Sequence, residues 1–272
     1  MSGPRNRPLT AFALVVYTFL FLPIAILVLF SFNSSRRNIQ WRGFTTEWYG
    51  RLLENDRVLD ALSVTLEVAV VAVIVSTILG ALLGLGLARS RARGGGATET
   101  LLLLPMMAPE IVMGLSLLLF FRQLFDAHGS ILQLQLAHIT FCISYVAVVV
   151  RARAANMDPQ LEEAARDLGA SAVGAFRYVT LPLIAPAVVA GAMLAFALSF
   201  DDYVVTTFNS GVGSSTLPLY IYGRIKFGVT PEINAISTII VAITAIVLFV
   251  AWRLGAFRGA GRTLAPLEER PG

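Results

Sequence analysis

Four carboxylates interrupt runs of the sequence that are otherwise apolar: Glu67, Glu110, Asp201 and Asp202. An ionised group at the centre of a membrane helix costs about 2.5–3.5 kcal/mol on insertion scales, so it usually faces an interior path. All four groups are acidic, and we therefore expect them to line a path that favours cations. Tyr203, beside the aspartate pair, adds a ring face suited to cation–π contact.

Three of these carboxylates also have a purely structural explanation. Asp201 and Asp202 are suited to accept backbone amides at a break in a helix. Glu67 lies near the end of its apolar run, where a charge reaches the membrane surface at little cost. The sequence leaves both readings open.

Residue types that carry enzyme chemistry are sparse. A P-loop requires Gly-Lys-Ser/Thr, but Ile225 precedes the only lysine, Lys226, so the chain is not an ATPase of that class. His128 and His138 match no metal-site spacing, and His138 favours a packed or hydrogen-bonded residue of a span. Cys142 is the only cysteine, which excludes an intrachain disulfide. We expect no catalytic residue, metal or cofactor in this chain.

The elements that must position these residues are membrane helices. The chain is 56% hydrophobic and only 14% charged, whereas soluble domains average about 25% charged residues. A membrane-spanning helix needs about 20 apolar residues. Six stretches qualify: 9–32, 62–88, 101–121, 131–150, 183–208 and 232–254. The sequence therefore predicts an all-α polytopic membrane protein with six transmembrane helices.

Several local signals refine this prediction. Pro105 and Pro109 predict a kinked third span beside a cavity, because backbone groups freed by proline need a partner inside the membrane. Thr230 is placed to cap the sixth span, and 217–228 suits an interfacial helix. Small residues at helical spacing predict close packing, or are ordinary membrane residues. They are Gly80, Gly84, Ala187, Gly191 and Ala195.

The arginines indicate how the spans are oriented. With both termini inside, 13 of the 21 basic residues lie inside and 8 outside, as the positive-inside rule requires. The clearest group is Arg89, Arg91 and Arg93. We expect residues 1–8 and 255–272 to be cytoplasmic, and the basic balance to reflect membrane surfaces rather than nucleic acid.

A polar stretch at 158–182 stands out in the second half of the chain. Asp158 and Pro159 are typical of a helix start, and Gly169 of a helix end. Between them Leu161 and Leu168 share an apolar face with Ala164 and Ala165. The opposite face carries Glu162, Glu163, Arg166 and Asp167. An amphipathic helix this short at 159–168 is marginal alone and needs a partner surface.

The same stretch carries a family motif. Glu163-Ala164-Ala165, three residues, Gly169, nine residues and Val179-Thr180-Leu181-Pro182 resemble the EAA loop of permease subunits of bacterial ABC importers. The departure from that motif is Val179 in place of isoleucine. The runs at 106–113, 198–205, 217–222 and 228–235 resemble spermidine/putrescine permeases of the PotC type.

The resemblance implies a type I ABC importer permease of MetI-like fold, with a transmembrane domain at 9–254 and a coupling (EAA) loop at 158–182. It implies ATPase-coupling roles for Glu162, Glu163, Ala164, Ala165, Asp167, Gly169, Leu181 and Pro182. The substrate path would then be lined by Asp201, Asp202, Glu110, Glu67 and Tyr203.

The resemblance also implies partners and a location. They are a homologous permease in a heterodimer, two ATP-binding subunits that hold ATP and Mg²⁺, a periplasmic binding protein, and lipid of the bacterial inner membrane. The cargo would be spermidine or putrescine. Two alternatives remain: the same architecture for ferric iron, thiosulfate or an opine, and a stand-alone secondary transporter or channel.

Overall fold

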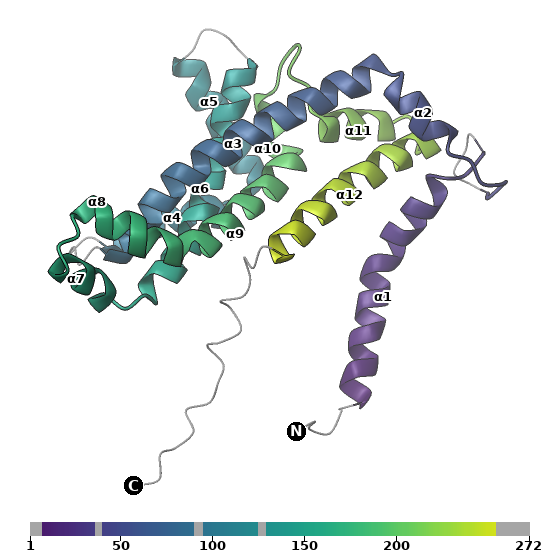
Figure 1. Cartoon of the computed structure of the whole chain (residues 1–272). Helices are drawn as coiled ribbons and strands as arrows, with labels where there is room; N and C mark the ends of the chain where they lie inside the picture. The colour runs from purple at the N-terminus through teal and green to yellow at the C-terminus, as the bar shows by residue number, and fades with distance from the viewer. Residues whose placement is uncertain (1–6, 36–39, 90–94, 125–128, 254–272) are drawn as a thin grey trace. The chain divides into compact units, whose positions relative to one another are not determined.

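The computed structural model describes residues 7–35, 40–89, 95–124 and 129–253. Within these ranges the regular elements are helices, apart from one isolated β-bridge between Asn33 and Phe44 (Figure 1). The predicted tail at 255–272, residues 1–6 of the predicted N-terminal segment, and Arg91, Arg93 and His128 lie outside the described residues.

Long apolar helices alternate with short helical segments along the described ranges. In chain order they are α1 (Arg7–Phe30), α2 (Glu47–Leu53), α3 (Asp56–Arg89), α4 (Gly95–Met107), α5 (Glu110–Leu124), α6 (Ile131–Ala155), α7 (Gln160–Asp167), α8 (Ala172–Ala175), the π-helical η1 (Phe176–Thr180), α9 (Leu181–Phe200), α10 (Val204–Asn209), α11 (Leu217–Ile225) and α12 (Pro231–Arg253).

Five helices in the described part of the chain are long and apolar enough to cross a membrane. They cover Pro8–Phe30, Asp56–Arg89, Ile131–Ala155, Ala172–Phe200 and Pro231–Val250. The third predicted span is instead divided between α4 and α5, and the fifth ends at Phe200 rather than continuing to 208. The all-helical membrane fold is confirmed, while the number of six spans stays a prediction.

The chain divides into two compact units, and the first contains residues 1–60 and 219–243. Here the chain that leaves α1 is pinned to α2, because the indole Nε1 of Trp48 donates to the carbonyl of Asn33 at 2.7 Å. The hydroxyls of Ser31 and Tyr49 lie 2.7 Å apart. α12 begins with the predicted cap, since the Thr230 hydroxyl accepts the N–H of Ile233 at 3.4 Å.

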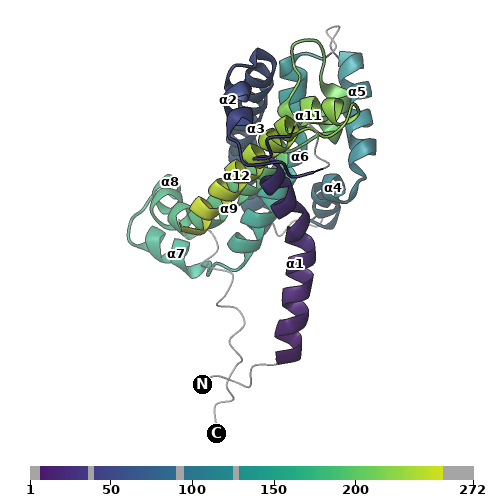
Figure 2. The ribbon, with the colours of Figure 1, turned by 90° about the vertical axis from the view of Figure 1, so that its right-hand side faces the viewer.

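The second unit contains residues 61–218 and the end of α12. Its core lies where α6 packs along α9, around Phe141, Val146, Ile184 and Ala195. Gly84 lets α3 approach α6 closely, because a Cβ there would lie 2.4 Å from the carbonyl oxygen of Ala147. Close packing at this glycine is therefore confirmed. α7 and α8 lie side by side (Figure 2), and both contact η1.

Two breaks in long apolar runs shape this second unit. The first lies between α4 and α5 at Ala108 and Pro109, because a residue before proline is disfavoured in helical geometry. The second lies between α9 and α10, at Asp201 to Tyr203, where the sequence contains neither proline nor glycine. The predicted interruption near Pro109 is confirmed, with Pro105 remaining inside α4.

Candidate functional site

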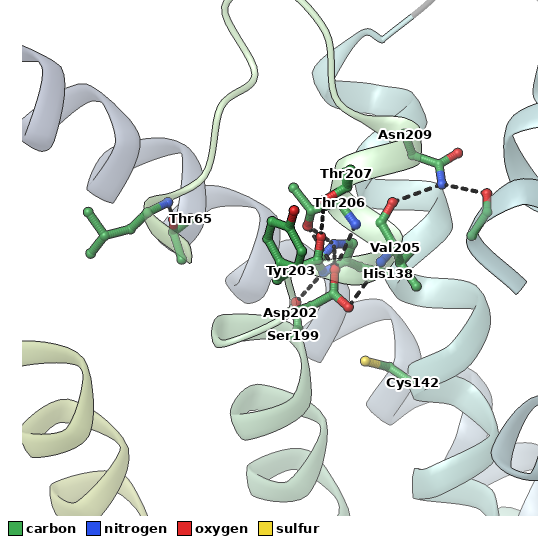
Figure 3. A network of polar contacts seen from close by, with 12 residues as sticks. Thr65, His138, Cys142, Ser199, Asp202, Tyr203, Val205, Thr206, Thr207 and Asn209 are labelled. Atoms are coloured by element: carbon green, nitrogen blue, oxygen red, sulfur yellow. Dashed lines mark hydrogen bonds and ion pairs between the residues drawn. The ribbon is translucent and has the colours of Figure 1, made fainter. Parts of the chain in front are cut away.

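Asp202 lies at the break between α9 and α10, where its carboxylate begins α10. Its oxygens accept the N–H of Val205 at 3.3 Å, the N–H of Thr206 at 2.8 Å and the hydroxyl of Thr206 at 2.8 Å (Figure 3). A carboxylate that accepts the free amides of a first turn is a helix cap. The structural explanation that the sequence left open therefore holds for Asp202.

His138 of α6 joins the two sides of this break. Its Nδ1 lies 2.8 Å from the hydroxyl of Ser199 on α9, and its Nε2 lies 3.1 Å from the hydroxyl of Thr206 on α10 (Figure 3). The Nε2 atom is also 3.5 Å from Asp202 Oδ2. The imidazole is completely buried. His138 is thus a hydrogen-bonded residue of a span, as the sequence favoured.

The directions of these hydrogen bonds determine the tautomer of His138. Thr206 has one hydroxyl hydrogen and donates it to Asp202, so Thr206 accepts from His138 Nε2–H. A neutral imidazole with a hydrogen on Nε2 has an acceptor at Nδ1. The Ser199 hydroxyl therefore donates to Nδ1. The imidazole thus gives both hydroxyls a partner.

α10 has only six residues and depends on its neighbours for a fixed position. The Asn209 side-chain nitrogen donates to the carbonyl of Gly114 on α5 at 3.1 Å and to that of Val205 at 3.0 Å (Figure 3). Its oxygen accepts from Gln133 Nε2 of α6 at 3.3 Å. Side chains of α6 and backbone of α5 thus hold the segment that follows Asp202.

A cavity of about 270 Å³ lies beside both helix breaks. Its acidic lining residues are Glu110, the first residue of α5, and Asp202. The rings of Phe141 and Tyr145 on α6 also line it. Carboxylates and aromatic faces are the groups that stabilise an organic ammonium ion away from water. The remaining lining residues are Pro105, Met106, Ala108, Pro109, Met113, Leu198 and Val205.

The other residues predicted for the substrate path lie elsewhere. Asp201 is exposed, and the lining of this cavity comes from its neighbour Asp202. Tyr203 stands at the start of α10, where its carbonyl accepts the N–H of Thr207 at 2.9 Å. Glu67 of α3 is exposed and accepts from Gln135 Nε2 at 3.1 Å. The structure thus brings Glu110 and Asp202 to one cavity, and their shared lining supports a common role.

Sequence reasoning did not find the groups that complete this site. Phe141 and Tyr145 line the cavity, and Ser199 and Thr206 hold His138. The spacing of the two rings by four residues on α6 places them on one helix face. This spacing could have indicated the two rings from the sequence. The partners of His138 could not be predicted in this way, because they come from distant segments.

The predicted coupling loop forms the helix α7 with both predicted ends. Asp158 Oδ1 accepts the N–H of Gln160 at 3.0 Å. At the other end Gly169 has φ of +89°. The N–H of Ala170 bonds to Ala165 O at 3.0 Å, and that of Gly169 to Arg166 O at 2.9 Å. These two bonds and a positive φ at the glycine make a Schellman motif.

Large side chains are exposed in the segment from α7 to η1. Leu168 is 91% exposed, Tyr178 76% and Val173 74%. Glu163, Ala164, Asp167, Leu181 and Pro182 are also exposed, whereas Ala165 is partly buried. No residue of α7 is buried. An exposed amphipathic helix with large apolar side chains at its end is suited to dock on another protein.

Glu162 lies differently from the other acidic residues of α7. Its carboxylate is only 20% exposed and pairs with Arg89, the last residue of α3. The hydroxyl of Thr180 also donates to it. Among the described residues no group of three or more His, Cys, Asp or Glu side chains is placed to hold a metal ion. The contacts of the Glu162 carboxylate are thus an ion pair with Arg89 and a hydrogen bond from Thr180.

Comparison with known proteins places these features in context. Residues 76–257 match the family described as "Binding-protein-dependent transport system inner membrane component". The chain is 43% identical over 249 residues to the putrescine transport system permease protein PotI of Escherichia coli K12, and the match covers 89% of each chain. It is 44% identical over 234 residues to the spermidine/putrescine transport system permease protein PotC of Haemophilus influenzae, with coverage of 86% and 91%.

Solved structures show the same fold at lower identity. A chain of a bacterial ABC transporter involved in the import of the acidic polysaccharide alginate superposes with a TM-score of 0.66 at 17% identity, covering 93% of this chain and 98% of that one. The MetNI methionine ABC transporter in an inward-facing conformation gives 0.58 at 17%, covering 80% and 100%. At these identities the likeness shows the fold alone.

Proposed function

Because this chain belongs to the family of inner-membrane components of binding-protein-dependent transport systems, we propose that it forms a polyamine path in an ATP-driven importer. The observation that carries the proposal is the cavity between the two helix breaks, where Glu110 and Asp202 meet the rings of Phe141 and Tyr145. The similarity to permeases named for putrescine and spermidine supports the same cargo class.

The chemistry of a polyamine explains why such a cavity needs carboxylates. Putrescine and spermidine carry ammonium groups separated by short methylene chains, and each ammonium loses water on entering the membrane. Two carboxylates from different helices offset that desolvation, and ring faces stabilise the adjacent methylenes and charges. Asp202 already accepts three hydrogen bonds inside the chain. Glu110 is therefore the carboxylate with more capacity for the cargo.

The α7 helix supports the second half of the proposal. We assign its exposed residues, among them Glu163, Asp167 and Leu168, to a groove of an ATP-hydrolysing subunit. ATP binding closes a pair of such subunits, α7 moves with them, and the spans change from inward-open to outward-open. A homologous permease completes the path, and a periplasmic binding protein delivers the cargo. Both termini lie in the cytoplasm of the bacterium.

Neutralising one carboxylate of the cavity tests the cargo. In proteoliposomes with the complete transporter, Glu110→Gln should lower the uptake of labelled putrescine or spermidine by about 10-fold or more, since a lost charge interaction of about 1.4 kcal/mol is a factor of 10. Glu54→Gln, which removes an exposed carboxylate just after α2, is the matched control and should leave uptake unchanged.

The same two variants also distinguish a polyamine path from an anion path. A path for an anion such as thiosulfate is relieved of repulsion when Glu110 becomes neutral, so anion uptake would rise or stay constant. Undiminished polyamine uptake by Glu110→Gln would contradict the proposed path. A stand-alone secondary transporter would carry polyamine in vesicles that contain this chain without an ATPase, which the importer proposal excludes.

A further inference from the structure

Three side chains from distant segments form a closed set of hydrogen bonds at the base of α7. Arg89 donates to Glu162 and, at 3.1 Å, to the hydroxyl of Thr180. Thr180 in turn donates to the same oxygen of Glu162. Arginine only donates, an ionised carboxylate only accepts, and a hydroxyl does both, so these three bonds are mutually compatible. We call Arg89, Glu162 and Thr180 the inner latch.

The inner latch is the specific polar attachment of α7 to α3. A cavity of about 420 Å³ is lined by Leu85 and Ala88 of α3, Ala154 of α6, and Glu163 and Arg166 of α7. Close apolar packing therefore does not fill the space between α7 and the ends of these two helices. Arg89 and Glu162 also line this cavity. The contact that joins α7 to α3 is thus polar and directional.

Thr180 places the inner latch directly before α9. It is completely buried and is the last residue of η1, directly before α9. η1 is a π-helical turn, in which the N–H of Leu181 bonds to the carbonyl of Phe176. π-Helical turns occur frequently at functional sites. α9 then runs 20 residues to Phe200 and carries Ser199, the partner of His138.

Helix α9 is long enough to link the two regions. A helix of that length extends about 30 Å, at 1.5 Å per residue. Thr180 and the break at Asp201 to Tyr203 thus lie at the two ends of one continuous helix. No residue of α7 is buried, so loss of the latch would weaken its attachment and leave it held by its contacts with α8 and η1.

We propose that Glu162 is a positioning residue that couples α7 to α9 through Arg89 and Thr180, and that it does not act by touching the ATPase. This inference rests on the proposed function, in which α7 docks on an ATP-hydrolysing subunit. It gives Glu162 a task distinct from that of the exposed docking residues of α7. Glu162 holds the helix to α3 through Arg89, whereas the exposed Asp167 and Leu168 face the partner.

The experiment measures polyamine transported per ATP hydrolysed by the complete transporter in proteoliposomes. Glu162→Gln and Thr180→Val should lower this ratio by at least about fivefold, the lower end of typical coupling factors. The ATPase should still co-purify in wild-type amounts, because its docking face is intact. Thr180→Ser keeps the hydroxyl and should retain the wild-type ratio.

A charge exchange makes the test specific. Arg89→Glu combined with Glu162→Arg keeps a guanidinium that donates to Thr180 and a carboxylate that accepts from it, so the double variant should recover much of the ratio that each single reversal loses. Glu47→Gln is the matched control. It removes the carboxylate from an exposed Arg–Glu pair, Arg51 to Glu47 at 2.5 Å, and should change nothing.

The possible outcomes separate failure of the inner latch from failure of the proposed function. The inner latch is wrong if Glu162→Gln and Thr180→Val keep wild-type coupling, or if the double reversal is no better than the single reversals. Wild-type protein that binds no ATPase or transports no polyamine would instead refute the proposed function. A Glu162→Gln variant that loses the ATPase on purification would assign Glu162 to the docking face and overturn the latch.

Discussion

At the scale of single residues, the function depends on how buried polar groups are satisfied. His138 provides the clearest case, because its two ring nitrogens pair with hydroxyls on either side of a helix break. Asp202 is held in turn by Thr206. The imidazole therefore contacts Thr206, which holds a carboxylate that lines the cavity, although His138 does not line the cavity itself.

Replacing this imidazole should destabilise the protein measurably. In His138→Ala the buried hydroxyl of Ser199 loses its partner, whereas that of Thr206 still donates to Asp202, and a buried polar group left unpaired costs about 1–3 kcal/mol. The thermal unfolding midpoint of the complex in detergent should fall clearly. His138→Gln keeps a donor and an acceptor and should fall less. Equal midpoints for His138→Ala and wild type would show that the network contributes little.

At the scale of elements, small residues determine how closely the spans pack. Gly84 and Gly86 lie two positions apart on α3 and differ in their surroundings. A Cβ at Gly84 would lie 2.4 Å from the carbonyl oxygen of Ala147 on α6, whereas no atom lies within 4 Å of one at Gly86. The two glycines therefore form a natural test pair.

Alanine should destabilise the protein at Gly84 but not at Gly86. Gly84→Ala forces α3 away from α6, and overpacking of this kind costs about 1–3 kcal/mol. Gly86→Ala should be neutral or stabilise by up to about 1 kcal/mol, since alanine is the better helix former. Thermal unfolding of both variants in detergent gives the comparison. Equal destabilisation by both would indicate that loss of helix flexibility, rather than close packing, explains the effect.

The elements also show what the sequence was able to predict. Helix ends have local signals, so the ends at Asp158 and Gly169 and the cap at Thr230 were predicted correctly. The resemblance to importer permeases was confirmed by the family match. The break after Phe200 has no proline or glycine and arises where Asp202 meets partners from α6 and α10. Such contacts cannot be read from neighbouring residues.

The roles of the carboxylates were predicted only in part for the same reason. Because burying a charge is costly, the sequence indicated Glu110 and Asp202 as path residues, and the structure brings both to one cavity. It did not separate Asp202 from Asp201, because that difference depends on the direction of each side chain at the helix break. Glu162 likewise pairs with Arg89, which is 73 positions away in the sequence.

At the scale of the whole molecule, the chain has a cavity lined by two carboxylates and an exposed amphipathic helix, and its sequence contains no P-loop motif. In the proposed function, the energy for transport comes from an ATP-hydrolysing partner. The exposed end of α7 is the surface suited to receive it, and Leu168 is its most exposed apolar side chain at 91%. Burial of a leucine in an interface contributes about 1.5–3 kcal/mol.

A charge at this position should therefore prevent docking. Leu168→Glu places a carboxylate where we propose an apolar contact with the ATPase, so the amount of ATPase that co-purifies should fall at least about 10-fold, equivalent to about 1.4 kcal/mol. Val212→Glu is the matched control, because Val212 is fully exposed in the loop after α10 and should tolerate a charge without loss of ATPase. Co-purification that survives Leu168→Glu would require a docking surface outside α7, and equal loss in both variants would point to general misfolding rather than to a lost interface.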